Sequence, residues 1–139
     1  MLYLSILCSL FFVKGTLLVQ VENLESDDGC LRIAFFNSEK SFLKDEQAVL
    51  ATEYYFKGTK GVQMRFEDIT FSTYAIAIYH DQNNNGKLDK NRLGIPKEPY
   101  AFSNNARAKW RSPKFKEAKF SFQKKEQKIK LELHRWSKN

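Results

Sequence analysis

The chain has few of the residues on which nucleophilic and thiolate-metal chemistry depend. Its 139 residues include two cysteines, Cys8 and Cys30, and two histidines, His80 and His134. We find no Ser-His-Asp or Cys-His combination that would support nucleophilic catalysis. Glycine and proline are also scarce, with six and three residues, which argues against a disordered or low-complexity chain. We therefore expect a folded protein that is not an enzyme.

One long apolar run occurs, at the start of the chain. Residues 1–13 are almost all apolar or small, and Lys14 and Gly15 follow them. The run is too short to span a bilayer but has the length of the hydrophobic region of a secretory signal, although no basic residues precede it. A buried first strand or helix is the alternative. We expect a signal peptide over residues 1–15, a single domain over residues 16–139, and a periplasmic or secreted protein.

Removal of that signal would leave Cys30 as the only cysteine. An intrachain disulfide and a thiolate metal site would then be excluded. Cys30 opens the apolar run Cys30–Phe36, and a thiol in such a run is typically buried in a strand. We therefore interpret Cys30 as a core residue and not as a nucleophile.

The net charge of +7 is unevenly distributed. Residues 1–100 carry 11 basic and 13 acidic side chains, a net −2, whereas residues 101–139 carry 12 and 3, a net +9. A basic C-terminal third could bind an anionic membrane surface or polymer. A solvated lysine face is the alternative. We find no recognition helix or RNA-binding motif, so we expect no nucleic-acid partner.

Apolar residues alternate with polar ones in several short runs, which predicts strands. The expected strands cover 17–21, 31–35, 52–56, 62–67, 74–80, 120–122 and 129–133. Turn signals separate them, among them Asp27-Asp28-Gly29. The segment 38–49 is the main helical candidate, and Ser112-Pro113 could open a short helical turn that ends at Ala118. The pattern predicts an all-β protein, a small antiparallel β-sandwich of about seven strands with one short helix.

The same alternation predicts which side chains face the interior of the sandwich. The expected core residues are Leu17, Val19, Ile33, Phe35, Val62 or Met64, Ile76, Ile78, Phe120, Ile129 and Leu131. His80 shares a strand face with Ile76 and Ile78, so we expect it in the core or at its rim. The segment from Asp81 to Arg111 shows no sustained periodicity and predicts a long Asp/Asn-rich loop, a kind of segment that is usually functional.

The start of this loop resembles part of a calcium-binding loop, with oxygen-bearing residues at alternate positions and Gly86 at the sharp turn. The candidate calcium ligands are Asp81, Asn83, Asn85, the carbonyl of Lys87, Asp89 and Glu98. Arg92 stands at the twelfth position, where a closing glutamate is usual, so Glu98 would have to close the site. We would then expect weak binding, with a Kd of roughly 10⁻⁴–10⁻³ M. A simple Asx-rich turn is the alternative.

Four segments together resemble a known family. They are Tyr74–Asp89, Leu93–Glu98, Tyr100–Ala106 and Pro113–Phe115. They resemble domain of unknown function 2141, a bacterial family of exported proteins with no established activity. The strand followed by an Asp-rich loop is also similar to transthyretin-like or Ig-like sandwich domains. The resemblance implies an exported sandwich that acts as an accessory binding or structural module.

We consider three functions. The first is an exported, non-catalytic module that binds a ligand, glycan or partner protein through residues 81–105, ordered by calcium. The second is an envelope protein whose basic C-terminal third binds anionic lipid or polymer. The third is a hydrolase that uses carboxylates of the loop with His80. Several polar residues could either line a groove beside the loop or tie the loop to the sandwich; they are Glu98, Tyr100, Ser103, Asn104 and Asn105. We expect a monomer.

Overall fold

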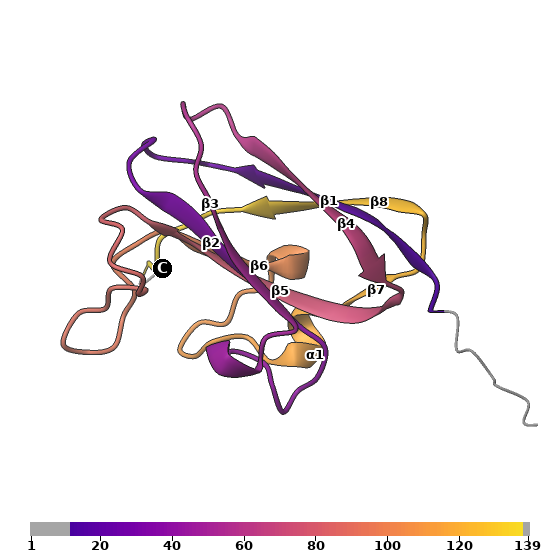
Figure 1. Cartoon of the computed structure of the whole chain (residues 1–139). Coiled ribbons are helices and arrows are strands. Elements are labelled where there is room, and N and C mark those ends of the chain that lie inside the picture. Colours follow the sequence, from indigo (N-terminus) through magenta and orange to yellow (C-terminus); the bar gives the residue numbers. More distant parts are fainter. Residues whose placement is uncertain (1–11, 138–139) are drawn as a thin grey trace, which may run out of the picture.

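Two β-sheets face each other and enclose an apolar core, as the computed structural model shows for residues 12–137 (Figure 1). Within these residues there are eight strands: β1 (Lys14–Glu22), β2 (Cys30–Phe36), β3 (Leu50–Tyr54), β4 (Val62–Thr70), β5 (Ser72–Asp81), β6 (Tyr100–Phe102), β7 (Phe120–Phe122) and β8 (Glu126–Glu132). The short helices are η1 (Asp45–Gln47), η2 (Ser103–Asn105) and α1 (Phe115–Ala118). The predicted small all-β sandwich is confirmed.

The first sheet has the strand order β4-β1-β8. β1 pairs antiparallel with β4 but parallel with β8, with Val19 opposite Ile129 and Val21 opposite Leu131. The parallel pair departs from the predicted antiparallel arrangement. Period-two alternation shows which face of a strand is buried and does not show in which direction its neighbour runs, so the sequence could not reveal this pair.

The second sheet has the strand order β3-β2-β5-β6, and β7 also pairs with β5. β5 is the longest strand and contacts three others, so it is the centre of this sheet. β6 lies inside the segment that we expected to be a loop. The sequence did not indicate this strand, because three residues are too few to show an alternating pattern. His80 donates its backbone N–H to the Pro99 carbonyl at 2.8 Å, just before β6 begins.

The predicted core is confirmed at most positions. Leu17, Val19, Ile33, Phe35, Met64, Ile76, Ile78 and Leu131 are buried between the sheets, and Val21, which was not in the predicted list, is buried with them. Ile129 and Phe120 are only partly buried, and Met64 takes the core position that we assigned to either Val62 or Met64. Cys30 is a buried free thiol within the described residues, as expected. Outside the sandwich, Phe115 of α1 and Phe102 of β6 belong to a second, smaller apolar cluster, in which the ring of Phe42 packs edge-on against both.

The helix predicted over residues 38–49 is wrong. Turns and bends occupy most of this segment, and η1 is its one short helical piece. Ser38 and Ser41 explain the difference, because the hydroxyl of Ser38 accepts the backbone N–H of Ser41 and the hydroxyl of Ser41 donates to the carbonyl of Ser38. Such local bonds compete with helix formation. β3 also begins at Leu50, two residues before the predicted start, whereas α1 lies within the predicted helical turn.

The signal peptide predicted over residues 1–15 lies mostly outside the described residues and stays a prediction. Of its last residues, Lys14 and Gly15 belong to β1 and pair with Thr70 and Ile69 of β4. Cleavage after Gly15 would leave β1 to begin at Thr16, whose N–H donates to the Lys125 carbonyl at 2.8 Å. In residues 12–137, no helix is long and apolar enough to cross a membrane.

Gly29 and Gly58 offer a matched test of the packing between the β1–β2 turn and the end of β5. Both have a positive φ, of +69° and +78°. A Cβ at Gly29 would lie 1.9 Å from the carbonyl oxygen of Asp81, whereas a Cβ at Gly58 would meet no atom within 4 Å. Each alanine loses about 1–2 kcal/mol to the left-handed conformation. We expect Gly29→Ala to lower the free energy of unfolding by about 1–3 kcal/mol more than Gly58→Ala.

Urea denaturation of the two variants measures this difference. Equal losses in both would show that the turn can move away from β5 without cost.

Candidate functional site

The long loop after β5 is anchored by the carboxylate of Asp81, which is fully buried. Its Oδ2 accepts hydrogen bonds from Arg32 Nε at 2.6 Å and from the Gly86 backbone N–H at 2.9 Å. Its Oδ1 accepts the Asn85 backbone N–H at 3.1 Å. Burial by itself would raise the pKa of Asp81, but the hydrogen bonds from Arg32, Gly86 and Asn85 outweigh it and the pKa is lowered. The ionised carboxylate therefore holds the first turn of the loop in place.

Asp89 gathers the asparagine side chains of the same turn. Its two carboxylate oxygens accept the side-chain amides of Asn83 at 2.7 Å and of Asn85 at 2.8 Å. The Asn85 side-chain oxygen in turn accepts the backbone N–H of Lys87 at 3.0 Å. Asn83 Oδ1 accepts the Asn85 N–H at 3.3 Å. The structure therefore brings Asp81, Asn83, Asn85 and Asp89 into one bonded turn.

Glu98 closes the loop from its far end. It is buried, and its two carboxylate oxygens accept the backbone N–H groups of Gln82 and Asp89, each at 3.0 Å. Lys97 adds a backbone bond from its N–H to the Asp89 carbonyl at 2.7 Å. The position predicted for Glu98, beside the Asp81 turn, is therefore the position that it occupies. Its oxygens bind backbone amides of the loop.

The donor set of this turn is the place to test the fit of a calcium ion. Every carboxylate in it already accepts at least two hydrogen bonds, and Arg32 brings a positive charge to Asp81. Within residues 12–137 no three carboxylate, histidine or cysteine groups are arranged to hold a metal ion. The side-chain amides of Asn83 and Asn85 now point their N–H groups at Asp89. They would have to rotate and present their oxygens instead before a cation could bind between them and Asp89. Calcium binding stays a prediction for this loop.

The polar residues that follow Glu98 tie the loop to the sandwich. The hydroxyl of Ser103 accepts the Ile76 N–H of β5 at 2.8 Å. The side-chain amide of Asn104 donates to the Lys119 carbonyl at 2.7 Å. The side-chain oxygen of Asn105 accepts the backbone N–H of Glu132 at 2.9 Å. For Ser103, Asn104 and Asn105 these bonds agree with the second of the two interpretations, in which they tie the loop to the sandwich.

His80 lies away from the carboxylates with which a hydrolase would have to combine it. It is fully buried in the sheet interior, its Nε2 is 2.6 Å from the Asp28 carbonyl oxygen, and its ring packs against Phe56. Asp81 follows it directly in β5, and successive side chains of a strand point to opposite faces. The core position expected for His80 is confirmed.

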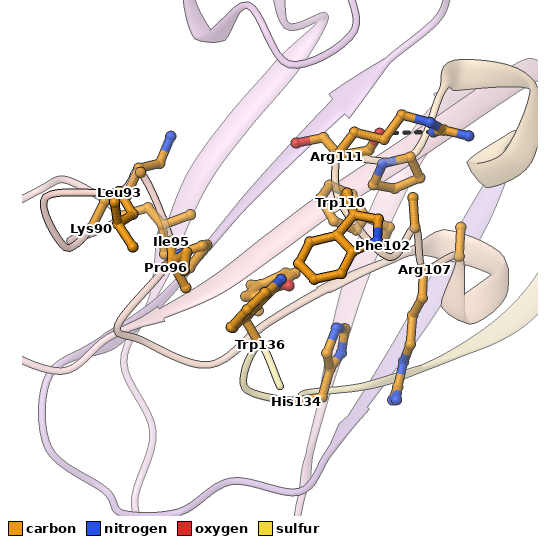
Figure 2. A pocket seen from close by; sticks show the side chains of 17 residues that line it. Lys90, Leu93, Ile95, Pro96, Phe102, Arg107, Trp110, Arg111, His134 and Trp136 are labelled. Atoms are coloured by element: carbon orange, nitrogen blue, oxygen red, sulfur yellow. Dashed lines mark hydrogen bonds between the residues drawn. The ribbon is translucent and has the colours of Figure 1, made fainter. Parts of the chain in front are cut away.

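A pocket of about 390 Å³ lies on the other side of the loop, between residues 88–96 and 106–113 (Figure 2). Five aromatic rings line it, and they belong to Tyr100, Phe102, Trp110, His134 and Trp136. The rings of Trp110 and Trp136 lie 6.2 Å apart, and those of Tyr100 and His134 lie 4.5 Å apart. Trp110 is 72% exposed at the rim. Sequence reasoning missed this pocket, because its walls come from three separate segments.

Basic side chains surround these rings. Lys90, Arg107 and Arg111 line the pocket, and Arg111 is paired with Glu117 at 2.8 Å. Burial and the charge of Arg107 lower the pKa of His134, so its imidazole is neutral at neutral pH. The pocket therefore combines an apolar, aromatic surface with a positive field from Lys90 and Arg107.

The buried Asp81 carboxylate generates a pH-dependent prediction. Because its pKa is lower in the folded protein than the ordinary value of 3.8, its ionised form stabilises the fold. That stability is fully present above the ordinary pKa and is lost as the pH falls through the folded pKa. We expect Asp81→Asn to lower the free energy of unfolding by about 2 kcal/mol at pH 7. We also expect the variant to lose less stability than the wild type between pH 5 and pH 2.

Urea denaturation at a series of pH values measures both effects. The exposed Asp45, changed to Asn, is the control, and it should keep the wild-type stability and slope. A wild-type slope in Asp81→Asn would show that this carboxylate does not stabilise the fold through its charge.

The comparisons with known proteins identify a family and name no activity. No curated protein and no solved structure matches the chain significantly. A family model described as an uncharacterized protein conserved in bacteria, DUF2141, matches residues 19–130, from the second half of β1 to most of β8. It thus includes the Asp81 turn, the Glu98 closure and most of the aromatic pocket. The chain therefore belongs to the DUF2141 family.

Proposed function

We propose that the protein is an exported, non-catalytic binding module whose ligand site is the aromatic pocket. The observation that carries the proposal is the convergence of both tryptophans of the chain, Trp110 and Trp136, on one pocket together with Tyr100 and Phe102. Ligand pockets typically have such a shape, with apolar and aromatic walls and a few polar groups. The volume of about 390 Å³ is in the range of a small ligand.

The anchoring of the loop supports this proposal. One wall of the pocket, residues 88–96, lies between the Asp81 turn, which is bonded to Arg32 of β2, and Glu98, which is bonded back to Gln82 and Asp89 at the start of the loop. The Tyr100 backbone also pairs with that of His134 through two hydrogen bonds of 3.0 Å, which bring the end of the chain to the pocket. A loop held by a rigid scaffold loses little conformational entropy when a ligand binds. A periplasmic or secreted location remains part of the proposal.

The alternative functions have less support. Part of the basic C-terminal third is neutralised, since Lys130 pairs with Glu22 at 2.9 Å and Arg111 pairs with Glu117. Other exposed lysines of this third, among them Lys116, Lys124 and Lys128, form no ion pair within residues 12–137, so an anionic membrane or polymer surface stays the alternative partner. Binding to such a surface would be strongly sensitive to salt. A hydrolase would need its acid and base in one cleft, whereas Asp81 and Glu98 hold backbone N–H groups.

Because the chain has two tryptophans and both line the pocket, their indole N–H signals report on this site directly. We expect at least one of four ring-shaped probes (benzoate, benzyl alcohol, glucuronate and glucose) to shift both indole signals in a saturable way. Trp136→Leu should weaken that binding about tenfold, measured from the indole signal of Trp110, which remains in the variant. The measurement is an NMR titration of nitrogen-labelled protein.

Tyr55→Leu is the matched control, because Tyr55 is an aromatic side chain that is 61% exposed and does not line the pocket. It should bind the probes as the wild type does. The proposal would be overturned if no probe moved the indole signals, or if Trp136→Leu bound the probes unchanged.

Calcium is the second candidate ligand, favoured by the convergence of Asp81, Asn83, Asn85, Asp89 and Glu98 in one turn. Weak binding predicts that several millimolar calcium raises the melting temperature of the wild type by a few degrees relative to chelator. Asp89→Asn, which removes a charge from the turn and leaves Arg32 with its partner, should abolish the shift. Magnesium at the same concentration is the control for ionic strength. An unchanged wild-type melting temperature would identify the turn as a bonded loop only.

A further inference from the structure

The charge of the aromatic pocket narrows the chemistry of its ligand. Resting on the proposed function, we infer that the pocket selects a ring-shaped ligand that carries a carboxylate or a similar single anionic group. The ring would lie against the tryptophans, and the anion would be bound by Arg107. This adds a ligand class to a pocket whose shape alone would also admit neutral or cationic molecules.

The first support is the balance of charge around the pocket. Among the described residues that line it there is no aspartate or glutamate. Lys90 and Arg107 form no ion pair within residues 12–137, whereas Arg111 already binds Glu117 through two hydrogen bonds of 2.8 and 3.1 Å. Two positive charges therefore act on the pocket without a carboxylate of the described chain to neutralise them, and they would repel a cationic ligand.

The second support is the position of Arg107 relative to the rings. Its charge acts on Tyr100 and on His134, which both line the pocket. Figure 2 shows Arg107 beside His134, while Lys90 lies on the far side of the Phe102 and Trp136 rings. The two basic groups thus stand at different ends of one aromatic surface. The guanidinium of an arginine binds a carboxylate with two parallel hydrogen bonds, whereas a lysine acts as a point charge.

The third support is the exposed apolar surface at the rim. Trp110 is 72% exposed and Leu93 is 83% exposed, and they line the pocket from its two walls. A group of large apolar side chains exposed around a pocket indicates a binding site more often than one isolated exposed apolar side chain does. A ligand with a flat apolar face would cover them, and a small inorganic anion would not. The ring and the anion are therefore both required.

The experiment compares two matched pairs of probes, each with an anionic and a neutral member. The pairs are benzoate with benzyl alcohol and glucuronate with glucose. We expect the anionic member of at least one pair to bind about fivefold or more tightly than its neutral partner at low salt, measured by the tryptophan indole signals. The pair that shows the preference distinguishes an aromatic acid from a sugar acid. Sodium chloride at 0.5 M should reduce the preference, because it screens exposed charges.

Arg107→Gln tests the residue that would bind the anion. This variant should bind the anionic and neutral members with similar affinity, while its affinity for the neutral member stays that of the wild type. Lys124→Gln removes a positive charge from the turn before β8, outside the pocket, and is the matched control. It should keep the wild-type preference. Thermal melts of both variants confirm that they are folded.

The outcomes separate the ligand class from the pocket itself. Equal binding of anionic and neutral probes by the wild type, or an unchanged preference in Arg107→Gln, would overturn the inference and leave the binding module in place. No indole shift with any of the four probes would overturn the pocket as a ligand site, and the inference with it.

Discussion

The carboxylate of Asp81 is the constraint on which the candidate site depends. It lies at the last residue of β5 and is fully buried, so it must be bonded to several donors to remain ionised there. Arg32 of β2 and the N–H groups of Asn85 and Gly86 supply them. One side chain thus joins the central strand, its neighbour and the first turn of the loop. The remaining loop is built outward from that turn, and one wall of the pocket with it.

Much of the sandwich could be predicted from the sequence because its strands bury one face. Ile76 and Ile78 in β5 and Val19 in β1 alternate with less buried residues, and all three are in the core. The helix expected over residues 38–49 failed because Ser38 and Ser41 satisfy the local backbone through their own side chains. The spacing of apolar residues does not show whether side-chain hydrogen bonds will compete with the backbone hydrogen bonds of a helix. β6 was missed for a different reason, since it is only three residues long and its pairing with β5 is determined by tertiary contacts.

In the candidate site, too, the features that depend on residues close in sequence could be predicted, and those that depend on residues distant in sequence could not. The Asp81 turn could be predicted, because the spacing of its residues within nine positions already determines which side chains can meet. The role of Arg32 could not, since it lies 49 residues away from Asp81 in the sequence. The aromatic pocket was hidden for the same reason. Tyr100 and His134 are brought together by a bridge between β6 and the segment after β8, and neither has a local pattern that indicates a partner.

The parallel pairing of β1 with β8 has a consequence for how the chain folds. Among the strands of residues 12–137, β1 is synthesised first and is the middle strand of its sheet, yet one of its two neighbours, β8, is synthesised last. Until β8 arrives, one edge of β1 keeps unpaired backbone groups, and part of the core lacks Leu131. Such distant pairing slows folding and keeps the nascent chain open for longer. The first sheet of this topology can therefore be completed only after β8 has been synthesised.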